Sequence, residues 1–399
     1  MRRHEINALH VIVYALMLVL FVAGLSSLRS GGEKQSTPTA ASVLIVEPGM
    51  RVADFGVRNH LSDPVLKNVF HLKGTADFNR GINTFGLSGE QIRALTSRAL
   101  ILNAEESSKS WPKIALKFGL WLGFLVTAFV FMRREAMTPI LRKTMYLAAV
   151  IVFGIALGSD PNPMGTVKDA IALYGSYHII FPPRLAAFLV FIATVMLANK
   201  FICAWGCQFG TLQDLVFRLN RNHQDTRGIL PQYKPPFVFT NTVRIIFFIT
   251  FVGAALIWSF DVIKPIDPFK IFMPRMMLIG GGIFLIGILS ASLFIYRPWC
   301  HFFCPFGLAG WLAEKLSVYK IAVNYQTCIG CETCAKACPS TVMHAILKRD
   351  TVIPDCFACG TCIQACPTRS IQFRCGKRMK PPIDNETIPP AKELKHRVP

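Results

Sequence analysis

Eight of the 13 cysteines in this chain of 399 residues form two copies of one motif, C-x2-C-x2-C-x3-C-P. The first copy contains Cys328, Cys331, Cys334 and Cys338, and the second contains Cys356, Cys359, Cys362 and Cys366. In bacterial proteins with two clusters, three cysteines of such a run bind one [4Fe–4S] cluster and the fourth binds the other. We therefore predict a first cluster bound by Cys328, Cys331, Cys334 and Cys366. The second would be bound by Cys356, Cys359, Cys362 and Cys338.

Zinc is the alternative metal for these cysteines, because C-x2-C pairs also build zinc ribbons. A zinc site needs neither the third cysteine of the run nor the proline after the fourth, and here both features occur twice. The spacing therefore favours iron–sulfur clusters over zinc. A cytoplasmic location would suit them, because thiols stay reduced in that compartment.

Four further cysteines form two C-x3-C pairs, each followed by x-Phe-Gly. The first pair is Cys203 and Cys207, and the second is Cys300 and Cys304. Residues four apart share a face of a helix, so we expect the two thiols of each pair to lie together. The four sulfurs would form an additional iron–sulfur or other metal centre, or a reversible dithiol. The alternative is that they are buried structural thiols, since free cysteine often behaves as a small apolar residue.

The two cysteine pairs belong to an internal duplication. Asp160-Pro161 precedes the apolar segment that leads to the first pair, and Asp267-Pro268 precedes the segment that leads to the second. Two hairpins of like orientation imply a pseudo-two-fold axis along the membrane normal. Any site that the pairs share is therefore expected where the two repeats meet.

Six apolar segments could hold these cysteines at a membrane. They cover approximately residues 11–27, 115–132, 144–158, 185–202, 245–260 and 277–296. A helix needs about 20 apolar residues to cross roughly 30 Å of hydrocarbon, and by that test the third and fifth segments are short. A composition of 52% hydrophobic and 17% charged residues argues against an ordinary soluble enzyme and agrees with a membrane protein.

The positions of the basic residues indicate how the chain crosses the membrane. With the amino terminus inside, the basic loops 133–143 and 203–244 face the cytoplasm, and so does the chain after residue 297. The opposite side receives residues 28–113, 159–184 and 261–276. This arrangement satisfies the positive-inside rule, so the formal charge of +20 reflects topology and does not indicate nucleic-acid binding. We predict a multi-pass protein of the bacterial inner membrane with both termini in the cytoplasm.

The predicted fold is an all-α membrane protein. It has about six transmembrane helices, a C-terminal bacterial-type two-[4Fe–4S] ferredoxin domain and a small helical periplasmic domain. The expected parts are an N-terminal transmembrane anchor, the periplasmic domain, a transmembrane core with the two C-x3-C hairpins, the ferredoxin-like domain and a disordered tail, over residues 1–28, 29–113, 114–310, 311–375 and 376–399. In the periplasmic domain, Ser88 and Gln91 fit a capping box, and Asp63-Pro64 fits a helix start.

Together these features resemble the NapH/NosR-type membrane polyferredoxins. The matching features are the C-x3-C pairs, the Asp-Pro loops and the paired motifs from Cys328 to Cys366, which cover about residues 115–370. Two features depart from the family. Gln208 replaces the proline that usually follows the first pair, and residues 28–113 stand in place of the covalent-flavin domain of the NosR branch. The resemblance implies electron transfer between the quinone pool or a cytoplasmic donor and a periplasmic redox protein or reductase, often in anaerobic respiration.

Three kinds of function are compatible with the sequence. The first is an integral membrane electron carrier, for example a quinol dehydrogenase subunit, whose cofactors would be two [4Fe–4S] clusters, a further metal or iron–sulfur centre, and quinone. The second is a membrane-bound redox sensor or an assembly factor for a periplasmic respiratory reductase, and the third is a scaffold subunit for a separate reductase. We predict the carrier. Electrons on the cytoplasmic side then need a quinone, the four-cysteine site or a partner's cofactor to cross roughly 30 Å of apolar core.

Overall fold

The computed structural model of the protein describes residues 2–29, 44–47, 49–72, 74–348 and 350–379. The predicted disordered tail lies outside the described residues from position 380 on. The chain divides into two compact units. The larger contains residues 1–31, 115–176 and 182–399, and the smaller contains residues 32–114 and 177–181.

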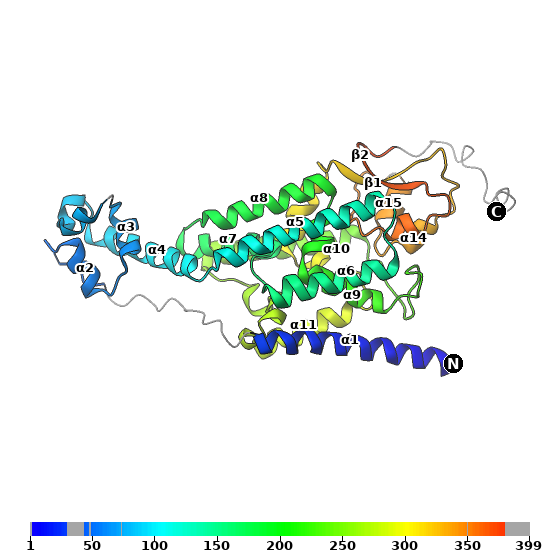
Figure 1. Ribbon diagram of the computed structural model, residues 1–399, viewed down its shortest axis with the longest axis horizontal. Coiled ribbons are helices and arrows are strands. Elements are labelled where there is room, and N and C mark those ends of the chain that lie inside the picture. The colour runs from blue at the N-terminus through cyan, green and yellow to red at the C-terminus, as the bar shows by residue number, and fades with distance from the viewer. Residues whose placement is uncertain (1, 30–43, 48, 73, 349, 380–399) are drawn as a thin grey trace. The chain divides into compact units, whose positions relative to one another are not determined.

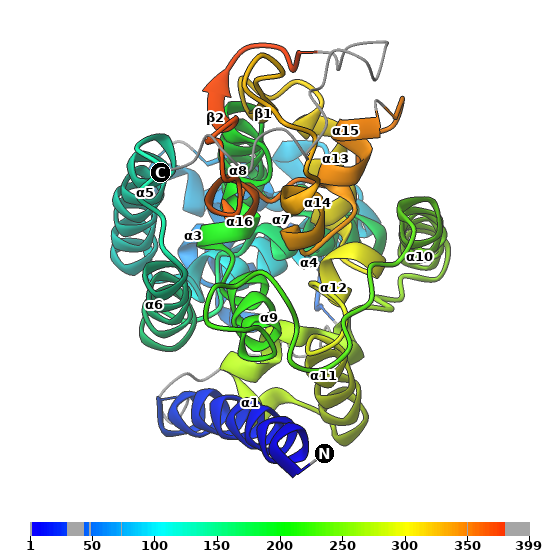
Figure 2. The ribbon, with the colours of Figure 1, turned by 90° about the vertical axis from the view of Figure 1, so that its right-hand side faces the viewer.

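The larger unit is built mainly from helices (Figure 1). Its long helices are α1 (Arg2–Arg29), α5 (Trp111–Arg133), α6 (Pro139–Ala149), α7 (Pro163–Tyr177), α8 (Pro182–Ala198), α9 (Gln208–Leu219), α10 (Phe237–Trp258), α11 (Ile279–Ala291) and α13 (Pro305–Glu314). Its short helices are the π-helices η4 (Val150–Ala156) and η5 (Ile202–Gly206), the 3-10 helices η6 (Lys264–Ile266), η7 (Pro268–Phe272) and η8 (Pro274–Met276), and α12 (Pro298–Phe302). Figure 2 looks along the bundle, with α5, α6, α10 and α11 seen at its periphery and α9 and α12 between them.

All six predicted spans fall on helices. Four helices in the described part of the chain are long and apolar enough to cross a membrane, namely His10–Leu28, Trp111–Arg133, Pro139–Ala156 and Phe237–Trp258. The remaining two spans are shorter apolar helices, Pro182–Ala198 and Ile279–Ala291. The third and fifth apolar runs are short, but α6 and α10 begin before them, at Pro139 and Phe237, so both helices are long enough to cross a membrane.

The outer faces of these helices are apolar. On α10, Ile246, Ile249 and Ile257 are 59%, 64% and 71% exposed, and their spacing places them on one side of the helix. A continuous apolar stripe of this kind is the surface that a lipid-facing helix presents. These features make the chain a membrane protein.

The cysteine-rich C-terminal region packs against one end of the helices (Figure 1). It contains strands β1 (Tyr319–Val323) and β2 (Ile371–Cys375) and the short helices α14 (Thr333–Ala337), α15 (Val342–Lys348) and α16 (Thr361–Gln364). The strands form an antiparallel pair in which Tyr319 faces Cys375. A single apolar core continues from the membrane helices into this region, through residues such as Phe201 and Phe373, whose rings stack 6.0 Å apart.

The smaller unit is a separate helical structure with its own apolar core. It consists of α2 (Val52–Arg58), α3 (Asp63–Phe70), the 3-10 helices η2 (Thr75–Asn79) and η3 (Ile82–Phe85), and α4 (Gly89–Ser107). The predicted capping box is confirmed: Ser88 Oγ accepts from the Gln91 amide at 3.2 Å, and Gln91 Oε1 accepts from the Ser88 amide at 2.9 Å. Helix α3 begins at Asp63, as predicted.

Candidate functional site

The first set of predicted cluster ligands lines one cavity. Its wall includes Cys328, Cys331, Cys334 and Cys366, so the last cysteine of the second motif lies with the first three of the first motif. Burial, together with the neighbouring Cys366, Cys328 and Cys331, raises the pKa of the Cys334 thiol to about 12. Closely spaced free thiols resist ionisation, because the resulting thiolates would repel one another. A bound cluster would stabilise all four cysteines as thiolates.

The second set is brought together in the same crossed manner. Burial, followed by the nearby sulfurs of Cys338, Cys359 and Cys356, raises the pKa of the Cys362 thiol well above its usual value. Cys359 differs from its neighbours, because Arg218 and Arg142 outweigh the effect of burial and lower the pKa of its thiol. The donor set of four cysteines fits the predicted cluster at each place.

The two motifs have identical spacing but very different surroundings. In the first motif, Gln326, Thr327, Gly330, Glu332 and Thr333 are exposed. In the second motif, the run from residue 354 to residue 358 is entirely buried. The first cluster site therefore lies at the surface of the C-terminal region, and the second lies inside the protein.

The second motif is buried because it packs directly against the first cysteine pair. The Lys200 amide donates to the Cys356 carbonyl at 3.3 Å, and the Trp205 indole N–H donates to the Ala358 carbonyl at 3.4 Å. The ring of Phe357 lies between two cations, 4.7 Å from Arg297 and 5.6 Å from Lys200. These contacts join the predicted second cluster to the membrane repeats.

Lys200 and Arg297 are equivalent residues of the duplication, and the sequence analysis overlooked them. Each stands three residues before the first cysteine of its pair, which is the signal that could have identified them. Lys200 Nζ donates to the Gly307 carbonyl at 2.6 Å and pairs with Asp355 at 2.6 Å. Arg297 donates to the Cys203 carbonyl at 2.6 Å. Each repeat thus reaches into the cysteine segment of the other.

Each cysteine pair straddles a break between two helices, which corrects the expectation of one continuous helix. Cys203 lies in the π-helix η5, and Cys207 is the N-cap of α9. Cys300 lies in α12, and Cys304 is the N-cap of α13. The break turns the backbone at the second cysteine, so that its sulfur can accept from amide groups at a helix start, as Cys207 Sγ does from the Gly210 amide at 3.4 Å.

The replacement of proline by Gln208 leaves the geometry of the first pair intact. The φ and ψ angles are −75° and 112° at Cys207, and −69° and 118° at Cys304. Gln208 and Pro305 both occupy the first position of a helix, where proline is well suited and other residues are tolerated. The amide of the Gln208 side chain donates to the Ser159 carbonyl at 2.7 Å.

The structure places thiols of the two pairs near one another. Cys304 and Cys207 are both among the electrostatic neighbours of Cys300, as is Cys203. The Gln213 side chain of the first repeat lies 3.8 Å from Cys300 Sγ. Among the residues described, no three His, Cys, Asp or Glu side chains converge on one metal ion, although tetrahedral zinc would hold its sulfurs only about 3.8 Å apart.

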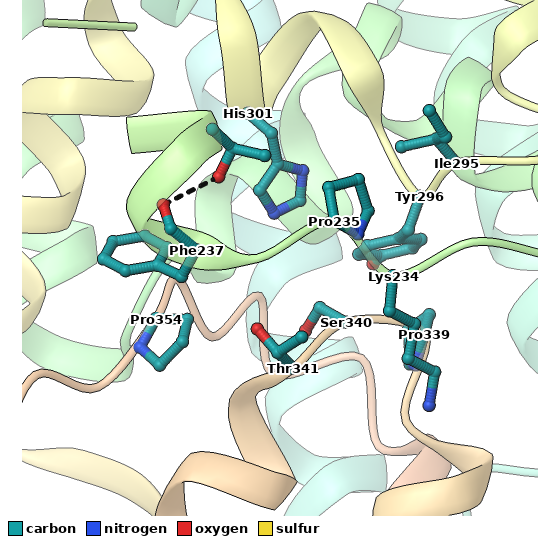
Figure 3. A pocket seen from close by; sticks show the side chains of 11 residues that line it. Lys234, Pro235, Phe237, Ile295, Tyr296, His301, Pro339, Ser340, Thr341 and Pro354 are labelled. Carbon is teal, nitrogen blue, oxygen red and sulfur yellow. Dashed lines mark hydrogen bonds between the residues drawn. The ribbon is translucent and has the colours of Figure 1, made fainter. Parts of the chain in front are cut away.

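A small cavity is lined by residues that neighbour Cys300 and Cys338 in the sequence (Figure 3). Its wall includes His301, which follows Cys300, and Ser340, two residues after Cys338. His301 Nδ1 lies 3.1 Å from the Arg297 carbonyl, which can only accept, so Nδ1 carries the proton and Nε2 remains an acceptor. Tyr296 and Lys234 also line the cavity, which combines apolar walls with a few polar groups.

Comparison with known protein families agrees with this arrangement. Residues 320–367 match a 4Fe–4S dicluster domain. One 4Fe–4S binding domain matches twice, over residues 180–226 and 277–323, which confirms the duplication around the cysteine pairs. Relatives include the regulatory protein NosR of Pseudomonas aeruginosa, 24% identical over 62% of this chain and 38% of NosR. The chain is thus similar to the NosR/NapH-type iron–sulfur membrane proteins.

Two further relatives match about half of the chain. YccM of Escherichia coli, whose name refers to electron transport, is 31% identical over 42% of this chain and 49% of YccM. NirI of Paracoccus denitrificans is 24% identical over 58% of this chain and 35% of NirI. The chain spans about half or less of the length of these relatives. No solved structure matches it.

Proposed function

We propose that this protein is a membrane electron carrier that connects the quinone pool or a cytoplasmic donor with a periplasmic redox partner. The observation that carries the proposal is the direct contact between the second cluster motif and the first cysteine pair. Lys200 and Trp205, on either side of Cys203, both donate to the backbone of residues 356–358. The predicted centres then form a continuous series from the exposed first motif to the membrane core.

The chain's own residues would divide the work as follows. Cys328, Cys331, Cys334 and Cys366 would hold one [4Fe–4S] cluster, and Cys338, Cys356, Cys359 and Cys362 would hold a second. When bound, such clusters supply one-electron redox chemistry at potentials that the protein adjusts. The exposed loop around Glu332 gives a soluble partner access to the first site. The buried run around Phe357 excludes water from the second.

Cys203, Cys207, Cys300 and Cys304 would form a shared third site between the repeats. The site would hold an iron–sulfur or other metal centre, or act as a reversible dithiol. Such a site would shorten the distance that electrons must travel through the apolar core, which is roughly 30 Å thick.

The proposed topology has six spans with both termini in the cytoplasm of a bacterial inner membrane. The shorter helices α8 and α11 would be the fifth and sixth spans beside the four long ones. The smaller unit would form the periplasmic domain. The relatives named NosR and NirI suggest a setting in anaerobic respiration. A second candidate function, a membrane-bound redox sensor or assembly factor, is supported by the name of NosR as a regulatory protein.

Anaerobic purification tests the proposal. The full-length protein should contain about eight irons in its two cubanes, with any iron beyond eight assigned to the third site. Low-temperature EPR spectra of the dithionite-reduced protein should contain the signals of interacting [4Fe–4S] centres. A quinol analogue should then reduce the centres within the time of a catalytic turnover. Stoichiometric clusters that no quinol and no low-potential donor can reduce would favour the sensor over the carrier.

A further inference from the structure

Two buried guanidinium groups from the membrane core lie against the second cysteine motif. Arg218 Nη1 donates to the Thr361 hydroxyl at 3.2 Å, and that hydroxyl lies 3.4 Å from Cys359 Sγ. Arg142 Nη2 donates to the Gln364 side chain at 3.3 Å. Neither arginine side chain is accessible to solvent. Both therefore act on this motif without solvent screening.

One nitrogen of Arg218 has no protein acceptor. Arg218 Nη2 is buried and makes no hydrogen bond to any residue that the structure describes. Buried donors are nearly always satisfied, so an orphan of this kind calls for an acceptor. A thiolate or sulfide of a centre held at Cys359 would supply one.

The charges around the second motif do not cancel. On one side, the cations Arg142, Arg218, Arg221 and Arg297 pair with only two carboxylates, Asp214 and Asp225. On the other side, Lys200 and Arg244 share Asp355, and Glu314 accepts from the Cys356 amide. Even with Glu314 ionised, the cations exceed the carboxylates by two.

The first motif meets a buried cation at its last turn, beside Cys338, where Arg221 donates to the Ala337 carbonyl at 2.8 Å. Around its first three cysteines the surroundings differ. Its nearest charged side chains in sequence, Glu332 and Lys336, are exposed and of opposite sign. Charges in contact with water interact weakly, because solvent and salt screen them. The two cysteine motifs therefore share a ligand pattern but differ in local electrostatic potential.

We propose that Arg142 and Arg218 raise the reduction potential of the centre held by Cys338, Cys356, Cys359 and Cys362. One-electron reduction adds a negative charge at this centre, and buried cations stabilise that charge. The effect favours electron flow from the exposed first centre towards the membrane. This inference rests on the proposed function, because it requires that the motif hold a cluster.

An EPR-monitored redox titration of the anaerobically purified full-length protein tests the inference. Arg142→Gln and Arg218→Gln should each lower the midpoint potential of one centre, the one whose signal is lost in Cys359→Ser, and leave the other unchanged. Arg142→Lys keeps the charge and should restore most of the wild-type potential. Arg133→Gln is the control, because Arg133 donates to the Phe373 carbonyl in the same C-terminal region but has no contact with the second motif.

A variant that should shift the midpoint potential in the opposite direction keeps the test valid even if the arginine variants fail to fold. Asp225→Asn removes a negative charge that Arg142, Arg218 and Arg221 share, and it should raise the same midpoint potential. Unchanged potentials in variants with full iron content would overturn the inference, and so would equal shifts of both centres. Wild-type protein without clusters would instead refute the proposed function, so the two failures are distinguishable.

Discussion

The Nζ atom of Lys200 lies 2.6 Å from the carbonyl oxygen of Gly307, to which it donates a hydrogen bond. The contact joins Lys200, three residues before the first cysteine pair, to Gly307, three residues after the second pair. Arg297 makes the reciprocal contact from the second repeat with the Cys203 carbonyl. The duplicated cysteine segments are therefore held to each other by equivalent cations.

The glycines of the two x-Phe-Gly elements should be intolerant of even one added methyl group. A Cβ atom on Gly210 would lie 2.7 Å from the Cys203 carbonyl oxygen, and one on Gly307 would lie 2.7 Å from the Cys300 carbonyl oxygen. We expect Gly210→Ala and Gly307→Ala each to destabilise the protein by about 1–3 kcal/mol, as overpacking does. Thermal unfolding of the detergent-purified variants measures the loss. Gly287→Ala, with open space around the added atom, is the matched control and should unfold as the wild type does.

The crossed ligand assignment predicts which cluster fails when Cys338 is replaced. Cys338→Ser should damage the centre held by Cys356, Cys359 and Cys362 more than the centre of its own motif. Iron content should fall from about eight towards about four, and the lost EPR signal should be the one that Cys359→Ser also removes. Cys375→Ser is the control, because Cys375 is exposed and belongs to neither motif. Loss of the signal associated with Cys331 instead would contradict the crossing.

If the two cysteine pairs form one site, the four single substitutions should have the same effect. Cys203→Ser, Cys207→Ser, Cys300→Ser and Cys304→Ser should each block electron passage through the membrane in proteoliposomes, while the eight-iron signal of the C-terminal region survives. A metal centre would appear as iron beyond eight per chain that is lost in all four variants. A dithiol would appear as two thiols that become unreactive on oxidation. Normal transfer after loss of one pair, with the other pair essential, would show that the pairs act separately.

Thiol labelling tests the orientation in the membrane. In a Cys375→Ser background, which removes the exposed native thiol, a cysteine at exposed Ser107 should react with an impermeant maleimide in intact spheroplasts. A cysteine at exposed Gln326 should react only after the membrane is permeabilised. Ser370 is unsuitable for this experiment, since it is 1% exposed and would escape labelling on either side. Labelling at Gln326 in intact spheroplasts would invert the topology.

The sequence was informative wherever a local pattern determines the structure. The spacing of the eight motif cysteines predicts the two crossed ligand sets, because cubane ligation imposes that spacing, and the assignment stays a prediction for iron content and EPR to test. The capping box at Ser88 and the positions of all six apolar helices also follow from neighbouring residues. The helix breaks at Cys207 and Cys304 were not predictable in this way, because a spacing of four residues fits a continuous helix equally well.

The unequal burial of the two cluster motifs also escaped sequence analysis. Both motifs read C-x2-C-x2-C-x3-C-P, yet the second is buried from residue 354 to residue 358, whereas Gly330, Glu332 and Thr333 of the first are exposed. The difference arises from contacts between distant residues, such as Lys200 with Asp355, which are 155 positions apart. The apolar pair Phe357-Ala358, between the first two cysteines of the second motif, is the one local sign of it.

The pairing of Lys200 and Arg244 with Asp355 has a consequence for biosynthesis. Both cations leave the ribosome long before the carboxylate that neutralises them inside the folded protein. During translation the inserted helices must therefore keep these two side chains hydrated at the membrane surface, since a buried and uncompensated charge is strongly unfavourable. The end of the repeats that carries the cysteine pairs can close only when the last cysteine motif has been made and has docked. Docking of the C-terminal region and completion of the helical fold are thus one event.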